Sequence, residues 1–217
     1  MMEKPVLICD FDGTVTKNDN IIAIMEQFAP AGWEELKESV LTQRISIKEG
    51  VGKMFALLPS SQKEEITDFI LHDAKIREGF TEFVAYAKEA GIPLYIVSGG
   101  MDFFVKPILN GLVPDNHIYC NMADFSGEYM HIDWPYSCDE HCGNACGCCK
   151  PSIVRHIAKG KDIIVIGDSI TDLEAAKLAD FVIARDLLLE KSRALGLTHK
   201  PFNTFYEVID HVKEAVK

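Results

Sequence analysis

The segment Asp10-Phe11-Asp12-Gly13-Thr14 places two carboxylates two positions apart, directly after a short apolar run. On a strand, side chains two positions apart point to the same side, and a bend at Gly13 can turn the second acid over a shared site. An aspartate carboxylate can attack a phosphoryl group as a covalent nucleophile. A second carboxylate can give a proton to the leaving oxygen and later take one from water. Taken alone, the segment could equally be a strand end followed by a turn.

A second pair of acids, Asp168 and Asp172, follows another apolar run. Asp10 and Asp168 together would form the hard oxygen site that Mg²⁺ prefers, with water and a substrate phosphate completing an octahedron. Several acids packed together would repel one another without a cation. Asp172 would also suit the first turn of a helix, where the helix dipole favours a negative charge. That alternative does not account for Asp168.

Two further features could bind a phosphate. Ser98 and Gly99, in the segment Ser98-Gly99-Gly100, offer a hydroxyl and exposed backbone amides to phosphate oxygens. Lys150 precedes Pro151 at a predicted helix start, and its ammonium could neutralise charge shared by a nucleophile and a phosphate. Each feature is weak alone, because most lysines are solvated surface groups. Their order along the chain, between the two acidic segments, favours a role in one site.

These residues need a scaffold that brings them together, and the apolar pattern predicts one. Three apolar runs lead to Asp10, Ser98 and Asp168, respectively: 6–9, 93–97 and 163–166. Each is continuous and rich in β-branched residues, which is typical of strands buried on both faces of a parallel sheet. Shorter strands are predicted at 117–119 and 181–183, and helices at 103–112, 151–158 and 170–178. We therefore predict an α/β fold with a Rossmann-like parallel sheet whose strand ends gather Asp10, Ser98 and Asp168 at one edge.

Residues 17–77 show helical spacing without a convincing strand. Two serine-to-glutamate patterns typical of helix starts support this interpretation: 46–49 and 61–64. We expect a helical cap over residues 17–77, inserted into an α/β core formed by residues 1–16 and 78–217. Apolar side chains expected in the interior of this cap are Trp33, Met54 and Phe55. Later in the chain, residues 121–135 around Gly127 predict a hairpin, and the pattern 204–207 predicts the start of a last helix.

The 217 residues carry a formal net charge of −11, which argues against nucleic acid or an anionic membrane as a partner. A small phosphorylated metabolite fits if a metal ion, a lysine or backbone amides supply local positive charge. No apolar run reaches the length of a bilayer span, and the N-terminus has no signal-peptide pattern, so a cytoplasmic location is expected. The oligomeric state is left open, with a homodimer among the options.

Together, the segments DFDGT, VSGG, a lysine before a helix, and GDSITD resemble the four motifs of the haloacid dehalogenase superfamily, in its phosphatase branch. The resemblance covers the whole predicted core with the motifs in order. The predicted insertion resembles the C1-type cap of that superfamily. The resemblance implies that Asp10 forms an aspartyl-phosphate and that Asp12 acts as general acid and base.

The same resemblance assigns further roles in a Mg²⁺-dependent phosphatase. It implies that Ser98, with the neighbouring Gly99, and Lys150 bind the phosphate. It implies that Mg²⁺ is held by the carboxylates of Asp10 and Asp168 and by the backbone carbonyl of Asp12. Two residues are expected to support the site: Thr14 and Asp172.

Within that branch, the chain resembles phosphoserine phosphatases in its VSGG segment and cap type, but Asp19 stands where that family carries a glutamate that binds the substrate amine. The segment from His141 to Lys150 instead resembles the bacterial 2-hydroxy-3-keto-5-methylthiopentenyl-1-phosphate phosphatases of methionine salvage. This resemblance implies hydrolysis of an enol phosphate to an acireductone and inorganic phosphate. A phosphoserine-type phosphatase is the alternative enzyme.

The chain has seven cysteines, and five of them fall between Cys138 and Cys149. These five, with His141, could bind a structural zinc ion, since four soft ligands close a tetrahedral site. The alternatives are a tight loop whose thiols only pack, and low-pKa thiols near Lys150 that are sensitive to oxidation. A hypothesis of another class follows, in which a metal or redox module of cysteines sits on an inactive phosphatase fold.

Overall fold

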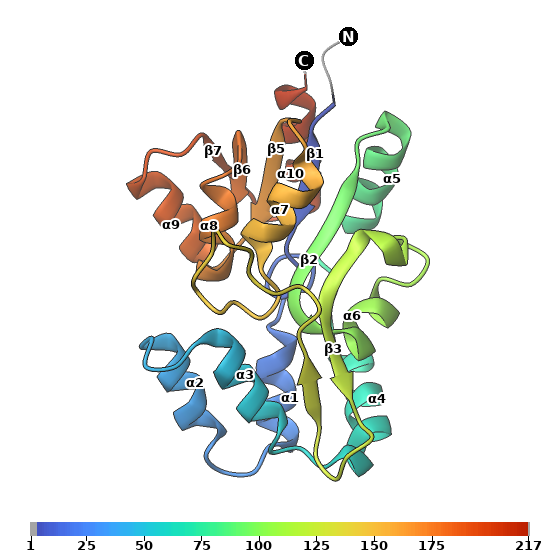
Figure 1. The fold of residues 1–217 in the computed structure, drawn as a ribbon. Helices are drawn as coiled ribbons and strands as arrows, with labels where there is room; N and C mark the ends of the chain where they lie inside the picture. Colours follow the sequence, from blue (N-terminus) through green and yellow to red (C-terminus); the bar gives the residue numbers. More distant parts are fainter. Residues whose placement is uncertain (1–3, 217) are drawn as a thin grey trace.

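A computed structural model describes residues 4–216 and contains a seven-stranded sheet in the order β4-β3-β2-β1-β5-β6-β7 (Figure 1). The strands are β1 (Val6–Cys9), β2 (Leu94–Met101), β3 (Ile118–Asp124), β4 (His131–Asp133), β5 (Ile163–Gly167), β6 (Phe181–Ala184) and β7 (His199–Pro201). All neighbouring pairs are parallel except β3 with β4, which form the predicted hairpin. The predicted α/β fold with a parallel sheet is confirmed.

The apolar runs form the middle of this sheet because both of their faces are covered. All four residues of β1 are buried, and β1 pairs with β2 on one side and with β5 on the other. Leu7 and Cys9 face one apolar core, whereas Val6 and Ile8 face a second core across the sheet. Burial of this apolar area is the main favourable term for such a layered fold.

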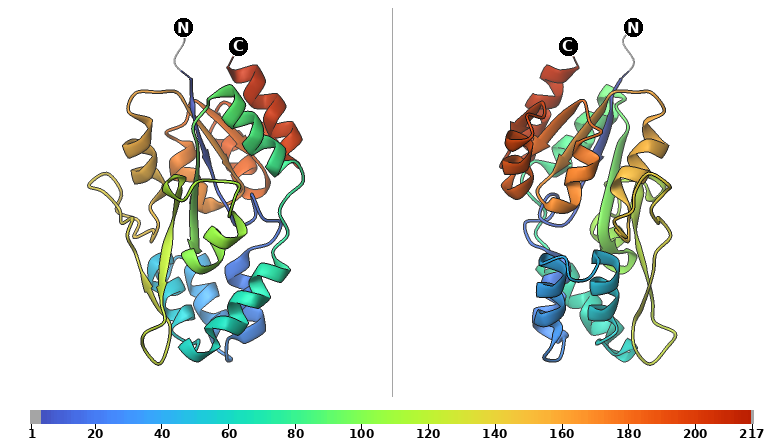
Figure 2. Two further views of the ribbon diagram at one scale, coloured as in Figure 1. Left: turned by 90° about the vertical axis from the view of Figure 1, so that its right-hand side faces the viewer. Right: turned by 60° about the vertical axis from the view of Figure 1, so that its left-hand side comes forward.

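Helices cover both faces of the sheet (Figure 2). The core helices are α5 (Phe80–Ala90), α6 (Asp102–Ile108), α7 (Lys150–Ala158), α8 (Leu173–Ala176), α9 (Asp186–Ala194) and α10 (Phe205–Ala215). The apolar sides of α5 and α10 pack on the first core, and those of α7, α8 and α9 on the second. The predicted capping box at the start of α10 is present, with Thr204 and Glu207 satisfying each other's backbone amides.

Four helices lie between β1 and α5: α1 (Asn20–Phe28), α2 (Trp33–Leu41), α3 (Ile47–Phe55) and α4 (Lys63–Asp73), with a short 3₁₀ turn η1 (Ser60–Gln62). Figure 1 shows them together beyond the carboxyl end of β1, with the β3–β4 hairpin running alongside. Two chain segments connect them to the sheet, and these meet in an isolated bridge between Thr16 and Ile76. Trp33, Met54 and Phe55 are buried among these helices, so they serve as apolar core there.

Several element boundaries differ from the sequence predictions. The strand β2 continues past Ser98 to Met101, because β3 keeps pairing with it after a register shift. The helix predicted at 103–112 ends at Ile108, where Pro107 in its last turn cannot donate a backbone hydrogen bond. The helix predicted at 170–178 is a 3₁₀ turn followed by α8. The predicted cap at Ser61 is wrong, since Ser61 lies within η1 and α4 begins after Gln62.

None of the helices in residues 4–216 combines the length and the apolar character that a bilayer crossing requires.

Candidate active site

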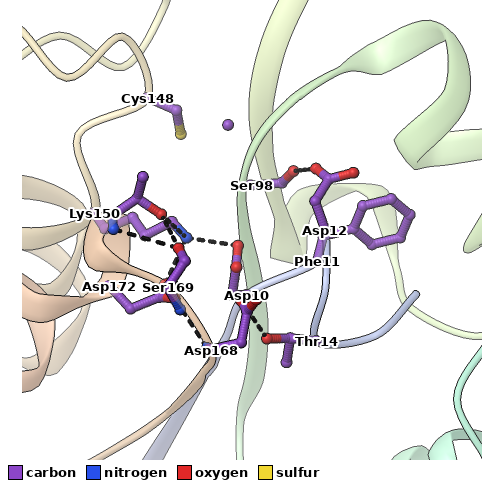
Figure 3. A network of polar contacts seen from close by, with 12 residues as sticks. Asp10, Phe11, Asp12, Thr14, Ser98, Cys148, Lys150, Asp168, Ser169 and Asp172 are labelled. Atoms are coloured by element: carbon purple, nitrogen blue, oxygen red, sulfur yellow. Dashed lines mark hydrogen bonds and ion pairs between the residues drawn. The ribbon is translucent and has the colours of Figure 1, made fainter. Parts of the chain in front are cut away.

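The strand ends bring the two acidic segments together (Figure 3). Cys9 and Ile166 are opposite each other in the β1–β5 pair, so Asp10 and Asp168 follow neighbouring strands. The backbone amide of Asp10 continues the ladder by donating to the carbonyl of Ile166 at 2.9 Å. Asp10 is buried, and Asp168 is partly buried beside it. This is the edge of the sheet at which the sequence predicts the site.

Lys150 is a buried cation that links two of these acids. Its Nζ lies 2.5 Å from Asp10 Oδ1 and 2.6 Å from Asp172 Oδ1, and only 6% of its side chain is exposed. Lys150 is the first residue of α7, and the proline at the next position has the backbone geometry of a first helical turn. Burial alone would lower the pKa of Lys150, but the two carboxylates outweigh burial and raise it. The lysine therefore stays charged.

Asp10, Asp168 and Asp172 each have a carboxylate oxygen within 4.8 Å of the others. Burial, reinforced by the charge of Asp172, raises the pKa of Asp10 well above its usual range. The same two causes raise the pKa of Asp168 to about 6. One lysine does not neutralise three neighbouring carboxylates. The cluster therefore has the oxygen donors and the excess negative charge that a divalent cation would satisfy.

Asp172 also stabilises the helical turn that follows β5, which is the alternative role that the sequence suggests for it. Its Oδ2 accepts hydrogen bonds from the backbone amides of Asp168 and Ser169, at 3.1 Å and 3.0 Å. Ser169 and Asp172 thereby form a capping box for the turn after β5. The two proposed roles of Asp172 coexist, because Oδ1 contacts Lys150 while Oδ2 holds the turn. Thr14 also contacts this group by donating to Asp168 Oδ1 at 3.1 Å.

Asp12 lies on the other side of Asp10, next to Ser98 (Figure 3). Its Oδ2 accepts from the Ser98 hydroxyl at 3.2 Å. Its Oδ1 accepts from the Asn20 side chain at 2.7 Å and from the Asn20 backbone amide at 3.1 Å. Burial, together with the nearby charge of Asp19, raises the pKa of Asp12 to about 7. A carboxyl with that pKa can give and take a proton near neutral pH.

The Ser98-Gly99-Gly100 segment is shaped by close packing. The Ser98 hydroxyl accepts from the Gly100 amide at 2.8 Å, and the Asn121 side chain donates to the Gly99 carbonyl at 2.8 Å. A Cβ on Gly100 would come within 3.0 Å of Asp12 Oδ2 and within 2.8 Å of the Phe104 ring. Only glycine fits there without displacing the acid. Gly99 has open space around it, which leaves room for a ligand.

Sequence reasoning missed three polar residues that hold the site. Asn20 and Asn121 are buried and donate the bonds just described. Arg77 is buried as well, and its guanidinium donates to the carbonyls of Gly13 at 2.7 Å and Thr14 at 2.8 Å. Arg77 thereby fixes the turn that follows Asp12. No local pattern marks these residues, because each acts on a partner that is distant along the chain or around a turn.

Asp19 is the position at which the sequence departs from the phosphoserine phosphatase pattern described above. In this structure it is the N-cap of α1, and its Oδ1 accepts from the Ile22 amide at 3.1 Å. A capping carboxylate is held by the helix start. The departure from the phosphoserine pattern therefore has a structural role in this chain.

The cysteine segment leads directly into Lys150. Cys138, Cys142, Cys146 and Cys149 bring their sulfur atoms within 4.8 Å of one another. Cys148 is buried apart from them, 3.8 Å from the Tyr119 carbonyl. Burial raises the pKa of the Cys148 thiol, which disfavours the hypothesis of a low-pKa thiol at that position.

Comparisons with known proteins agree with this architecture. A family model described as haloacid dehalogenase-like hydrolase matches residues 7–177. A protein of Geobacillus thermodenitrificans (strain NG80-2) named 2-hydroxy-3-keto-5-methylthiopentenyl-1-phosphate phosphatase is 60% identical over 214 residues, which cover 98% of this chain and 97% of that protein. A protein of the same name from Geobacillus kaustophilus (strain HTA426) is 61% identical over 211 residues, or 97% of this chain and 96% of that protein.

Among solved structures, a phosphoserine phosphatase captured as an analogue of its phospho-aspartyl intermediate superposes with a TM-score of 0.74. It is 22% identical and covers 96% of this chain and 99% of its own. That likeness supports the fold, while the family model and the relatives establish the membership that the motifs indicate. The chain belongs to the haloacid dehalogenase-like hydrolases.

Proposed function

We propose that this protein is a Mg²⁺-dependent phosphomonoesterase in which Asp10 is the nucleophile. The observation that carries the proposal is the buried contact of Asp10 with Lys150 at 2.5 Å, beside a second acid group on the neighbouring strand end. Lys150 keeps one oxygen of Asp10 oriented and limits its protonation. The Ser98 hydroxyl lies on the opposite side of Asp10 (Figure 3). Gly99, the next residue, has open space around it in which phosphate oxygens would bind.

The residues present fit a magnesium ion. Asp10 and Asp168 supply carboxylate oxygens within 4.8 Å of each other, and the backbone carbonyl of Asp12 is the third donor that we assign. Oxygen donors of this kind suit a hard divalent cation. When bound, the ion would neutralise negative charge on the acids and on the transferred phosphoryl group.

The residues of the chain then divide the reaction between them. An oxygen of Asp10 attacks phosphorus, and the bond from phosphorus to the leaving oxygen breaks while Asp12 gives that oxygen a proton. Water next attacks the aspartyl-phosphate, and Asp12 takes a proton from the water. Asp10 is released with inorganic phosphate. A pKa of about 7 for Asp12 suits both transfers.

We further propose that residues 17–77 act as a cap over the core formed by residues 1–16 and 78–217. The helices α1 to α4 stand beyond the strand end that carries Asp10, where they can close over a bound metabolite (Figure 1). Residues from this part of the chain also reach the site, since Asn20 donates to Asp12. Lid closure of this kind excludes water from a reacting phosphate.

The substrate that we assign is the enol phosphate named in the relatives, 2-hydroxy-3-keto-5-methylthiopentenyl-1-phosphate, with an acireductone as product in methionine salvage. Identity of 60% over nearly the whole chain supports this choice. We place the enzyme in the cytoplasm, since none of the seven cysteines, all of which lie in the described residues, forms a disulfide, as expected in a reducing compartment.

A substrate panel tests the proposal. Phosphate release is measured with the enol phosphate, phosphoserine and pyridoxal phosphate, each with Mg²⁺ and with EDTA. We expect the highest kcat/KM for the enol phosphate and no turnover in EDTA. Asp10→Asn is the control for contaminating phosphatases and should be inactive on all three compounds. A preference for phosphoserine would overturn the substrate assignment, and full activity of Asp10→Asn would overturn the nucleophile.

A further inference from the structure

We propose that Cys138, Cys142, Cys146 and Cys149 bind one structural zinc ion, which holds the loop that leads into Lys150. The loop is residues 134–149, between the end of β4 and the start of α7. Neither the comparisons nor the catalytic chemistry accounts for these four thiols. The metal would be separate from the magnesium site, because its ligands are soft sulfur atoms and not carboxylates.

The spacing of the sulfur atoms matches a single tetrahedral ion. Zinc binds cysteine sulfur at about 2.3 Å, so two sulfurs on a tetrahedron lie about 3.8 Å apart. The sulfurs of Cys142 and Cys146 are 3.7 Å apart, and all four lie within 4.8 Å of one another. The widest of these separations would contract by at most about 1 Å to reach the tetrahedral value. An iron–sulfur cluster would hold its thiolates on separate ions, which these short separations do not allow.

The four ligands reach from the middle of the loop to the N-cap of the helix that follows it, which gives the site its structural purpose. Cys138, Cys142 and Cys146 lie at every fourth position in the loop, whereas Cys149 is the N-cap residue of α7. Cys149 is fully buried, while the other three are partly buried. A closed four-thiolate site at this point would tie the partly exposed loop to the start of a core helix.

Tyr136 and Cys148 pack on the core at the two ends of the loop, whereas residues 138–146 between them are exposed or only partly buried. The loop is long for a segment without helix or strand, and such loops need a reason to stay ordered. Asp139 forms a salt bridge with Arg155, which connects the loop to α7. Ala145 adopts a left-handed backbone with φ +49°, which costs about 1 kcal/mol for a residue with a Cβ. A metal that fixes Cys142 and Cys146 would hold the backbone on both sides of Ala145.

The remaining candidate ligands stand outside the group. Cys148 lies between Cys146 and Cys149 in the sequence, but its sulfur points away from theirs, toward the Tyr119 carbonyl. His141 is mostly exposed and lies 3.5 Å from the Glu140 carboxylate. Cys148 is therefore a matched control, since it is a buried thiol in the same loop with no place in the site.

The position of the site connects the zinc ion to catalysis. Cys149 precedes Lys150 directly, so a fixed Cys149 sulfur restrains the helix start from which the lysine reaches Asp10. On its other side, the loop contacts α3, where the Lys48 amide donates to the Ala145 carbonyl at 3.3 Å. Loss of the metal would loosen both contacts. We expect kcat to fall by about 10- to 100-fold, as is typical when a group that orients a catalytic residue is removed.

Cobalt substitution tests binding without relying on activity. Protein prepared with Co²⁺ in place of Zn²⁺ should bind about one ion per chain and show thiolate-to-cobalt charge-transfer absorption, with the strong visible bands of a tetrahedral ion. The double variant Cys142→Ser/Cys146→Ser should lose both the ion and the bands. Cys148→Ala should keep them, and so should Asp10→Asn, which removes only a carboxylate of the magnesium site.

Limited proteolysis tests the structural role on the same proteins. The double variant should be cleaved faster within residues 138–149 than wild type, with an unchanged far-ultraviolet circular dichroism spectrum. Wild-type protein that binds no Co²⁺ or Zn²⁺, or a double variant that keeps the cobalt bands, would overturn the site. A double variant that loses the ion but keeps wild-type cleavage and kcat would overturn its connection to Lys150.

Discussion

The substitution Lys150→Met removes the cation that, among residues 4–216, forms the ion pairs with Asp10 and Asp172, and it nearly preserves the side-chain length. The lysine and both acids have exposed fractions of 6% or less. Solvent therefore screens the interaction little. In the variant, two buried carboxylates would lose their partner while the neighbouring charge of Asp168 remains.

Breaking a buried ion pair by removing one partner costs about 3–5 kcal/mol, because a charge is left buried and uncompensated. We expect Lys150→Met to lower the free energy of unfolding by that amount at pH 7 in EDTA. The pKa of Asp10 is already raised in the wild type, with Lys150 among the causes that lower it. Its loss should raise the pKa of Asp10 further.

The sign of the pH dependence follows from this shift. With a raised pKa, the native variant binds more protons than the unfolded chain, so its stability falls as pH rises through the native pKa. Each such carboxyl changes the free energy of unfolding by about 1.4 kcal/mol per pH unit. Between pH 7 and pH 5, the variant should therefore recover more stability than wild type does.

Urea denaturation at pH 5 and pH 7 in EDTA measures both effects. The double variant Lys150→Met/Asp10→Asn is the matched control, because it removes a carboxylate together with the lysine. We expect it to be more stable at pH 7 than Lys150→Met alone. A loss below 1 kcal/mol at pH 7, or equal losses at the two pH values, would refute the account of Lys150 as a buried charge partner.

Three other predictions concern the turn around Asp12. Gly13→Ala should raise the Mg²⁺ concentration needed for half-maximal activity at least tenfold, because its Cβ would overlap the Asp168 carboxylate. Gly111→Ala has nearly the same φ with open space around it, so a Mg²⁺ titration of both should show the defect only at Gly13. The kcat/KM should fall above about pH 7, where Asp12 loses its proton. Asp19→Asn should move this fall to lower pH, because it removes a negative charge that raises the pKa of Asp12. An unchanged pH profile would contradict the role of Asp12 as the general acid. Arg77→Met should cost about 2 kcal/mol or more in urea denaturation, since its buried guanidinium bonds two carbonyls of the turn, and unchanged stability would show that the turn does not need it.

The position of the acids could be predicted because it depends on strong local patterns. Buried parallel strands are continuous apolar runs, and their carboxyl ends meet at one edge of the sheet. Asp10 and Asp168 directly follow such runs, so their proximity needs only the strand assignment and the pairing of β1 with β5. Lys150 is predicted from its order among the motifs.

The supporting contacts could not be predicted because they join residues far apart along the chain. Arg77 bonds the carbonyl of Thr14 across 63 positions, and Asn121 bonds the carbonyl of Gly99 across 22. Ser61 shows the opposite error. Its spacing to Glu64 matches a capping box, but the tight turn η1 moves the helix start past it.

The cysteine loop shows a third limit of sequence patterns. Spacing alone gives six candidate metal ligands, five thiols and one imidazole, with no standard pairing. The fold separates Cys148 and His141 from the others by turning one inward and leaving the other in solvent. Which thiols converge depends on the path of the whole loop, so only the structure could select four.

The most direct test of the central claim is detection of phosphate on Asp10. Wild-type protein mixed with Mg²⁺ and the enol phosphate is quenched in acid within one turnover and digested, and the peptide that contains Asp10 is analysed by mass spectrometry. We predict the mass of one added phosphoryl group on Asp10 in wild type, with none in Asp10→Asn. Turnover without any phosphorylated peptide, or with the phosphoryl group on another residue, would contradict the mechanism.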